Sequence, residues 1–290
     1  VIDSSTDNIE STIQVDNFPY DLEVNPFNNR IYITNRESNT VSVIDGSTNQ
    51  RLSNINVEDS PVGISINPSL NMVYVTNLNS KSLSIIDSID NKVTETIKLN
   101  EPVYGVAVNP LTNLVYISNL INNTLSVLDG KTNKIINKIA VENMPTAINI
   151  NYKTNLIYVT NYLSNSISVI DGLTNKVIST IKVAKYPVDT VVNPLTNKVY
   201  VSHNGDDTAL SIIDGMTNKK IKELCKSRSK RWAIEKSQKL KAAAERNPFQ
   251  KTLYQSHLLS LSMYINMLLQ YKEHLSELEA EIDTLAKEIE

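Results

Sequence analysis

The chain has 290 residues, of which 41% are apolar, and its formal net charge is -3. This length and apolar content allow a sizeable buried core, which excludes an intrinsically disordered chain. The near-neutral charge excludes a nucleic-acid binder that acts through overall charge, and no apolar run approaches the roughly 18 residues that a membrane-spanning helix needs.

The small number of cysteine and histidine residues limits the possible disulfide and metal chemistry, and the first residue bears on export. Cys225 is the single cysteine, so the chain can form no intramolecular disulfide and has no CxxC pair for zinc or haem. Histidine occurs only at His203, His257 and His274, too sparsely for a metal site with histidine spacing. We therefore predict no metal and no cofactor. Because residue 1 is Val, we expect any export signal to have been removed already.

A unit of 42 residues recurs along most of the chain, marked by an Asn that a Tyr follows seven residues later. The recurring residues are Asn25, Asn67, Asn109, Asn151 and Asn193, with Tyr32, Tyr74, Tyr116, Tyr158 and Tyr200. Self-similarity at this period indicates a repeat architecture, in which each unit buries its apolar face against the next copy. The chain opens partway through a unit, because residues 1–3 are in phase with residues 43–45. We therefore expect a third strand there and a fourth strand at residues 9–15.

Each complete unit contains four short predicted strands. In the second copy they lie at residues 62–66, 72–77, 82–87 and 92–99, where β-branched residues and Tyr dominate and Asn, Asp, Gly or Pro separate the runs. Four antiparallel strands in about 42 residues are typical of a propeller blade. The first strand of each unit is rich in small residues, which crowding at a central axis favours, so we predict it to be innermost.

An Asp marks the turn between the third and fourth strands. The turns are Asp45-Gly46, Asp129-Gly130, Asp171-Gly172 and Asp214-Gly215, with Asp87-Ser88 as a departure. We interpret each Asp as a side-chain acceptor that forms the turn, and each Gly as a residue that tolerates positive φ. A catalytic or metal-binding row of aspartates is the disfavoured alternative.

The second strands carry a recurring motif. It reads Ile31-Tyr32-Ile33-Thr34-Asn35, Val73-Tyr74-Val75-Thr76-Asn77, Val115-Tyr116-Ile117-Ser118-Asn119, Ile157-Tyr158-Val159-Thr160-Asn161 and Val199-Tyr200-Val201-Ser202-His203. The motif resembles the signature of the YVTN-repeat β-propellers over residues 1–224. The resemblance implies a propeller, commonly of seven blades, found in archaeal surface-layer proteins and exported bacterial proteins, with a binding or structural role. Five blades and a half are present, so we expect a fragment of a larger ring: an open arc or a strained small ring.

The fifth unit contains the best candidate for a local ligand or ion site. His203 replaces the Asn of the repeat, and the loop that follows is one residue longer than its counterparts and contains Asp206 and Asp207. A harmless loop insertion is the alternative, because loops tolerate insertions. The repeated Asn and Tyr residues are expected to form structural hydrogen bonds and packing contacts rather than a site.

The composition changes near residue 224: of thirty-six Asn, only Asn247 and Asn266 lie beyond it. We place a domain boundary there and predict a helical tail over residues 225–290, with helices at about 233–246 and from 249 onward. Apolar residues recur at steps of three and four between Leu261 and Ile289, which is typical of a coiled coil or helical hairpin. Self-association through this tail is therefore expected.

The start of the tail is basic, with Lys226, Arg228, Lys230, Arg231 and Trp232 as candidate nucleic-acid contacts; a solvated helical face is the alternative. Three segments, 231–236, 242–244 and 278–290, also resemble the helical linker of DEDD-type insertion-sequence transposases. That resemblance implies a mobile-element remnant without recombinase chemistry, since neither catalytic domain of that family is visible.

Together these patterns predict an all-β propeller of five four-stranded blades and a two-stranded half-blade, followed by an α-helical tail. We expect a non-catalytic binding or scaffold module, extracellular or on the cell surface, that presents its loops to a protein or another cell-surface macromolecule. The alternative is a nucleic-acid-associated protein that uses the basic tail. A propeller lyase or lactonase is disfavoured.

Overall fold

The computed structural model describes residues 1–205 and 208–225, which form strands and turns. The strands make five four-stranded antiparallel sheets and one two-stranded sheet. The predicted helical tail lies outside the described residues. In the part that the structure describes, no helix is long and apolar enough to cross a membrane.

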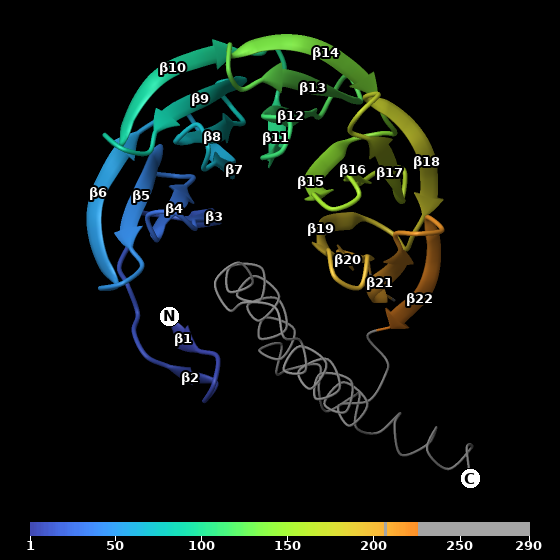
Figure 1. The fold of residues 1–290 in the computed structure, drawn as a ribbon, viewed down its shortest axis with the longest axis horizontal. Helices are drawn as coiled ribbons and strands as arrows, with labels where there is room; N and C mark the ends of the chain where they lie inside the picture. The colour runs from blue at the N-terminus through green and yellow to red at the C-terminus, as the bar shows by residue number, and fades with distance from the viewer. Residues whose placement is uncertain (206–207, 226–290) are drawn as a thin grey trace.

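The five sheets are arranged as blades around a common axis, in a propeller-like arc (Figure 1). Within each blade the strand order follows the chain, and the first strand lies innermost, as predicted. The first blade contains β3 (Pro19–Asn25), β4 (Arg30–Asn35), β5 (Thr40–Asp45) and β6 (Gln50–Asn56). The second contains β7 (Pro61–Asn67), β8 (Met72–Asn77), β9 (Ser82–Asp87) and β10 (Lys92–Lys98). The third contains β11 (Val103–Asn109), β12 (Leu114–Asn119), β13 (Thr124–Asp129) and β14 (Lys134–Ala140). The fourth contains β15 (Pro145–Asn151), β16 (Leu156–Asn161), β17 (Ser166–Asp171) and β18 (Lys176–Lys182). The fifth contains β19 (Pro187–Asn193), β20 (Lys198–His203), β21 (Thr208–Asp214) and β22 (Lys219–Cys225).

The arc is open. Inner strands of neighbouring blades lie side by side from β3 through β7, β11 and β15 to β19, whereas a wide gap separates the first blade from the fifth (Figure 1). The half-blade, β1 (Ile2–Asp3) and β2 (Asn8–Ile9), lies beside this gap and forms a sheet of its own. Of the two expected shapes, the structure has the open arc rather than the small ring.

The half-blade is smaller than predicted. The expected fourth strand at residues 9–15 shrinks to β2, in which Asn8 and Ile9 pair with Asp3 and Ile2. Val1 and Ser11 still contact each other, since the backbone N of Val1 donates to the backbone O of Ser11 at 2.6 Å, but the paired ladder itself ends at Ile9.

The interpretation of the Asp turns is confirmed, but that of their glycines is wrong. Asp45 Oδ1 accepts hydrogen bonds from the backbone N of Ser47 at 2.8 Å and of Thr48 at 3.2 Å, which makes it a turn former. No described glycine has positive φ. The left-handed residues in these turns are instead Asn49, Asn91, Asn133, Asn175 and Asn218.

Close approach accounts for the glycines. Gly46 N donates to the backbone O of Asn29 at 2.8 Å, and a Cβ on Gly46 would lie 2.6 Å from that oxygen. The turn between the third and fourth strands is thus pressed against the turn between the first and second. The second blade keeps the same bond with Ser88 in place of glycine, so the glycine is favoured at this position but not indispensable.

Blades are joined by apolar packing and by a repeating set of hydrogen bonds. One core cluster, for example, combines Tyr32 and Val41 of the first blade with Val73 and Val75 of the second. The tyrosine rings of the first four blades are fully buried, and three of their hydroxyls, those of Tyr32, Tyr74 and Tyr116, bond to the next blade: Tyr116 Oη donates to Asn175 Oδ1 at 2.9 Å. The repeated tyrosines therefore serve as packing residues with a polar anchor, as expected.

The repeated Asn rows are also structural. At the ends of the second strands, Asn35 Nδ2 donates to Thr40 Oγ1 at 3.0 Å and to Ser42 Oγ at 2.9 Å, within its own blade. At the ends of the first strands, Asn109 Nδ2 donates to Asn155 Oδ1 of the next blade at 2.6 Å. Because the repeated polar side chains are engaged inside the fold, residues that depart from the repeat are the candidates for a binding role.

Candidate binding surface on the linker face

One face of the arc carries the connections between blades. We call it the linker face, because it carries the inter-blade connections at residues 57–60, 99–102, 141–144 and 183–186. It also carries the hairpin turns at residues 36–39, 78–81, 120–123 and 162–165. Loops of this kind, held by a rigid scaffold, are where binding residues concentrate.

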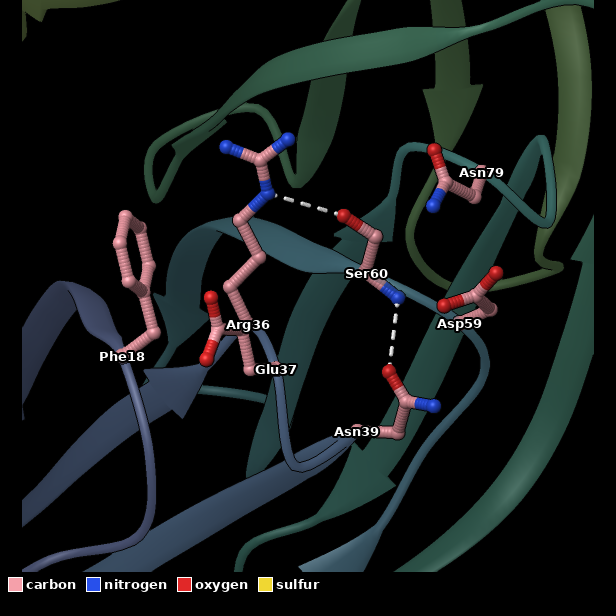
Figure 2. Close-up of a pocket in the computed structure, with 7 residues that line it drawn as sticks. All are labelled: Phe18, Arg36, Glu37, Asn39, Asp59, Ser60 and Asn79. Carbon is pink, nitrogen blue, oxygen red and sulfur yellow. Dashed lines mark hydrogen bonds between the residues drawn. The ribbon is translucent and has the colours of Figure 1, made fainter.

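A hollow of about 440 Å³ opens on the linker face between the first two blades (Figure 2). Its lining residues are Phe18, Arg36, Glu37, Asn39, Asp59, Ser60 and Asn79. Two hydrogen bonds fix its walls: Ser60 N donates to Asn39 Oδ1 at 2.9 Å, and Arg36 Nε donates to Ser60 Oγ at 3.0 Å. The hollow is therefore preformed and mostly polar.

Arg36 is the centre of this site. Its guanidinium lies over the rings of Phe18 and Tyr20, at 5.9 and 5.6 Å from their centroids, within the range of a cation–π contact. The described ion pairs are Arg51–Asp16, Lys98–Glu58 and Lys138–Glu101, so within the described residues Arg36 has no acidic partner. Figure 2 shows its two terminal nitrogens directed away from the other lining residues. They remain available as donors for an incoming acceptor.

Aromatic side chains continue from Arg36 towards the axis. Tyr20 and Tyr104, from the first and third blades, meet edge to face with centroids 6.1 Å apart, and their hydroxyls are hydrogen-bonded. Phe18 and Tyr20 remain 49% and 40% exposed. Exposed aromatic rings beside an arginine are the composition that protein interfaces favour.

Phe18 also has an unusual backbone. Its φ is 56°, in the left-handed region, where a bulky residue is disfavoured by roughly 1 kcal/mol or more. Ser60, Met144 and Tyr186 occupy the equivalent place in other blades, also with positive φ. The positive φ is therefore a feature of the repeated connection, and in the first blade the residue that adopts it is an exposed Phe.

Carboxyl groups lie deeper, on the inner strands. Asp21 reaches the axial space and keeps contact with solvent, yet the strands around it bury it enough to raise its pKa to about 7, and the charge of Asp189 adds to the shift. Burial likewise raises the pKa of Glu23 to about 8. Asp21 Oδ2 accepts the backbone N of Ile64 at 3.2 Å. No cluster of three metal-ligating side chains occurs among the described residues.

The sequence-predicted site is only partly described. His203 is 9% exposed and its Nε2 lies 2.9 Å from Ser211 Oγ. This bond matches the one that Asn161 Nδ2 makes to Ser168 Oγ at 2.9 Å, so His203 fills the place of the structural Asn. Asp206 and Asp207 lie outside the described residues, as do the candidate nucleic-acid contacts Lys226, Arg228, Lys230, Arg231 and Trp232.

Sequence reasoning missed Arg36, Phe18, Tyr20 and Tyr104. One signal was present: the positions equivalent to Arg36 hold Leu78, Leu120 and Tyr162 in the next three units. A charged residue at a position where the next three copies have Leu or Tyr and the fifth has Asn204 is a departure from the repeat of the kind that marked His203. The sequence pattern does not show that residues up to 84 positions apart lie close together in the fold.

Comparisons with known proteins support the fold. No protein-family model and no curated protein matches the chain. Among solved structures, hydrazine synthase from Kuenenia stuttgartiensis is similar with a TM-score of 0.62 and 20% identity, over 71% of this chain and 66% of that one. A functionally unknown protein from Desulfotomaculum acetoxidans is similar with a TM-score of 0.64 and 15% identity, over 73% of this chain and 71% of that one. At these identities the likeness shows the repeated-blade, propeller-like fold alone.

Proposed function

We propose that this chain is a non-catalytic binding or scaffold module, which engages a protein or another cell-surface macromolecule through its linker face. The observation that carries this proposal is the cluster of Arg36, Phe18 and Tyr20. These residues are not part of the repeat, they gather beside a preformed hollow, and the guanidinium keeps its terminal donors available. Arginine and tyrosine are the residues that most often dominate binding energy at protein interfaces.

Two further parts of the proposal concern the location of the protein and the larger array of blades to which the arc belongs. The resemblance of the second strands to YVTN-repeat propellers favours an extracellular or cell-surface location. The separate half-blade and the gap beside it favour an arc that belongs to a larger array of blades, because a propeller protects its strand edges by closing on itself.

The test is an affinity capture from the surface fraction of cells, with the full chain and its Arg36→Ala variant as paired baits. We expect at least one captured species to be depleted about tenfold or more by the variant, which corresponds to a loss of about 1.4 kcal/mol or more in binding free energy. Direct titration of that species against both baits would then give the two affinities.

Arg51→Ala is the matched control. Arg51 is an exposed arginine on the outer strand β6, where it pairs with Asp16 at 3.0 Å, and it does not line the hollow. It should leave the captured set unchanged. Equal capture by the wild type and the Arg36→Ala variant would contradict the proposal.

A further inference from the structure

The second strand of each blade has two sides, which face different neighbours. In the inner three blades both sides are covered: Val73, Tyr74 and Val75 of β8 are all 0% exposed, and their counterparts in β12 and β16 are equally buried. These side chains alternate across the sheet, as successive residues of a strand do. The two ends of the arc reveal which side meets which neighbour.

In the first and the fifth blade, one side of the second strand is partly exposed. In β4 of the first blade, Ile31 and Ile33 are partly exposed while Tyr32 is fully buried. In β20 of the fifth blade the pattern is reversed: Tyr200 is partly exposed while Val201 is fully buried. The isoleucine side therefore meets the preceding blade and the tyrosine side meets the following one. The two open ends are the two halves of one interface.

The polar groups at the ends are complementary as well. Asn67, Asn109 and Asn151 each donate from Nδ2 to an Asn Oδ1 of the following blade, at 2.6 to 2.9 Å. The Nδ2 of Asn193, their counterpart in the fifth blade, has no such acceptor among the described residues. The acceptor that the repeat predicts for it is Asn29 of a first blade, whose side chain likewise has no hydrogen bond among the described residues.

The tyrosine hydroxyls follow the same rule. Tyr32 and Tyr116 donate to Asn91 Oδ1 and Asn175 Oδ1 of the following blades, at 3.1 and 2.9 Å. The equivalent partner for Tyr200 is Asn49 of a first blade. A first blade thus offers the fifth blade the apolar face that the inner blades receive, and acceptors of the kind that most of the repeated Asn and Tyr side chains use. Asn25 Nδ2 and Tyr158 Oη are exceptions, because neither has a hydrogen bond among the described residues.

We infer that the fifth blade of one copy docks onto the first blade of a second copy of this chain, head to tail. The inference rests on the proposed larger array of blades and adds that a second copy of this chain supplies the next blade. It is independent of the Arg36 surface. The half-blade consists only of the short strands β1 and β2, and Ile31 and Ile33 of β4 remain partly exposed for this contact.

A head-to-tail contact uses different surfaces on the two partners, so each added copy presents a new free end. The full chain should therefore form a concentration-dependent series of species rather than a single dimer. Sedimentation velocity over two decades of concentration would show the weight-average sedimentation coefficient rising continuously. A single monomeric boundary throughout would overturn the inference.

Variants identify the surfaces. Ile33→Lys and Tyr200→Lys each place a charge on one open end, and each should weaken association at least about tenfold. Ile178→Lys is the matched control, because Ile178 is 52% exposed on the outer strand β18 and faces no blade. Thermal unfolding followed by circular dichroism confirms that each variant is folded. Association that is unchanged by both end variants would overturn the inference, and would assign it to residues 225–290.

Crosslinking tests the register without relying on a destabilising change. In a Cys225→Ser background, Asn29→Cys and Asn193→Cys chains with different tags are mixed and treated with a short bis-maleimide. Head-to-tail docking predicts a mixed crosslinked product and little product from either variant alone. Absence of the mixed product at concentrations where the chains associate would overturn the inference. Arg36→Ala should leave association unchanged, so failure here and failure of the proposed function are distinguishable.

Discussion

At the scale of single residues, the repeat separates positions that serve the fold from positions that do not. The small residues of the inner strands belong to the first kind. Gly105 has no positive φ, yet a Cβ there would lie 2.3 Å from the backbone O of Thr146 in the next blade. Gly63 is crowded in the same way by Tyr104 O at 2.6 Å. The small residues thus allow neighbouring inner strands to approach closely.

We expect Gly105→Ala to lower the free energy of unfolding by about 1–3 kcal/mol, because the added methyl group must push two inner strands apart. Urea denaturation followed by tyrosine fluorescence would measure the loss. The fourth blade already has Ala147 at the equivalent position, so Ala147→Gly is the control, with an expected loss of at most about 1 kcal/mol. Equal losses in the two variants would contradict the crowding argument.

Residue types alone predicted part of the fold. The alternation of Val, Ile and Tyr predicted the strands, and the Asp-containing turns predicted where the strands end. Both predictions depend only on local chemistry. The role of the turn glycines depends on a neighbouring turn that the local pattern does not include, and the prediction of positive φ was accordingly wrong. The cluster around Arg36 depends on Tyr20 and on Phe18, whose approach to Arg36 only the folded blade produces.

At the scale of elements, β3 is the inner strand with two carboxyl groups. It carries Asp21 and Glu23, whereas the equivalent positions in β7 are Gly63 and Ser65, and β19 has a carboxyl group only at the first of them, Asp189. Burial raises the pKa of both carboxyls, to about 7 and about 8. In the unfolded chain the same groups titrate near 4. The folded chain therefore holds protons that the unfolded chain releases.

This difference predicts how stability depends on pH. As the pH rises from about 4 towards 8, the unfolded chain loses these protons before the folded chain does, so stability falls across this window and levels off above about 8. The double variant Asp21→Asn, Glu23→Gln should show a clearly smaller fall in urea midpoint between pH 5 and pH 8. Glu142→Gln, at an exposed connection, is the control. An unchanged pH dependence in the double variant would contradict the role given to β3.

At the scale of the whole molecule, five similar sheets stack around an axis and leave two complementary ends. The period of 42 residues predicted the number of blades and their strand order, because each copy repeats the same pattern of strand and turn residues. It also left two alternatives for closure, an open arc and a small ring. The choice between them depends on the angle between blades, which the packing of neighbouring sheets sets and no single unit encodes.

The central claim is that each blade buries one face against the next and that no described residue covers this face of the last blade. Tyr116→Ala and Tyr200→Ala make the same change at an inner and a terminal blade, and unfolding free energies in urea at low protein concentration compare them. We expect about 3–5 kcal/mol of loss for the fully buried Tyr116 and clearly less for the partly exposed Tyr200. Equal losses at the two positions would contradict the account.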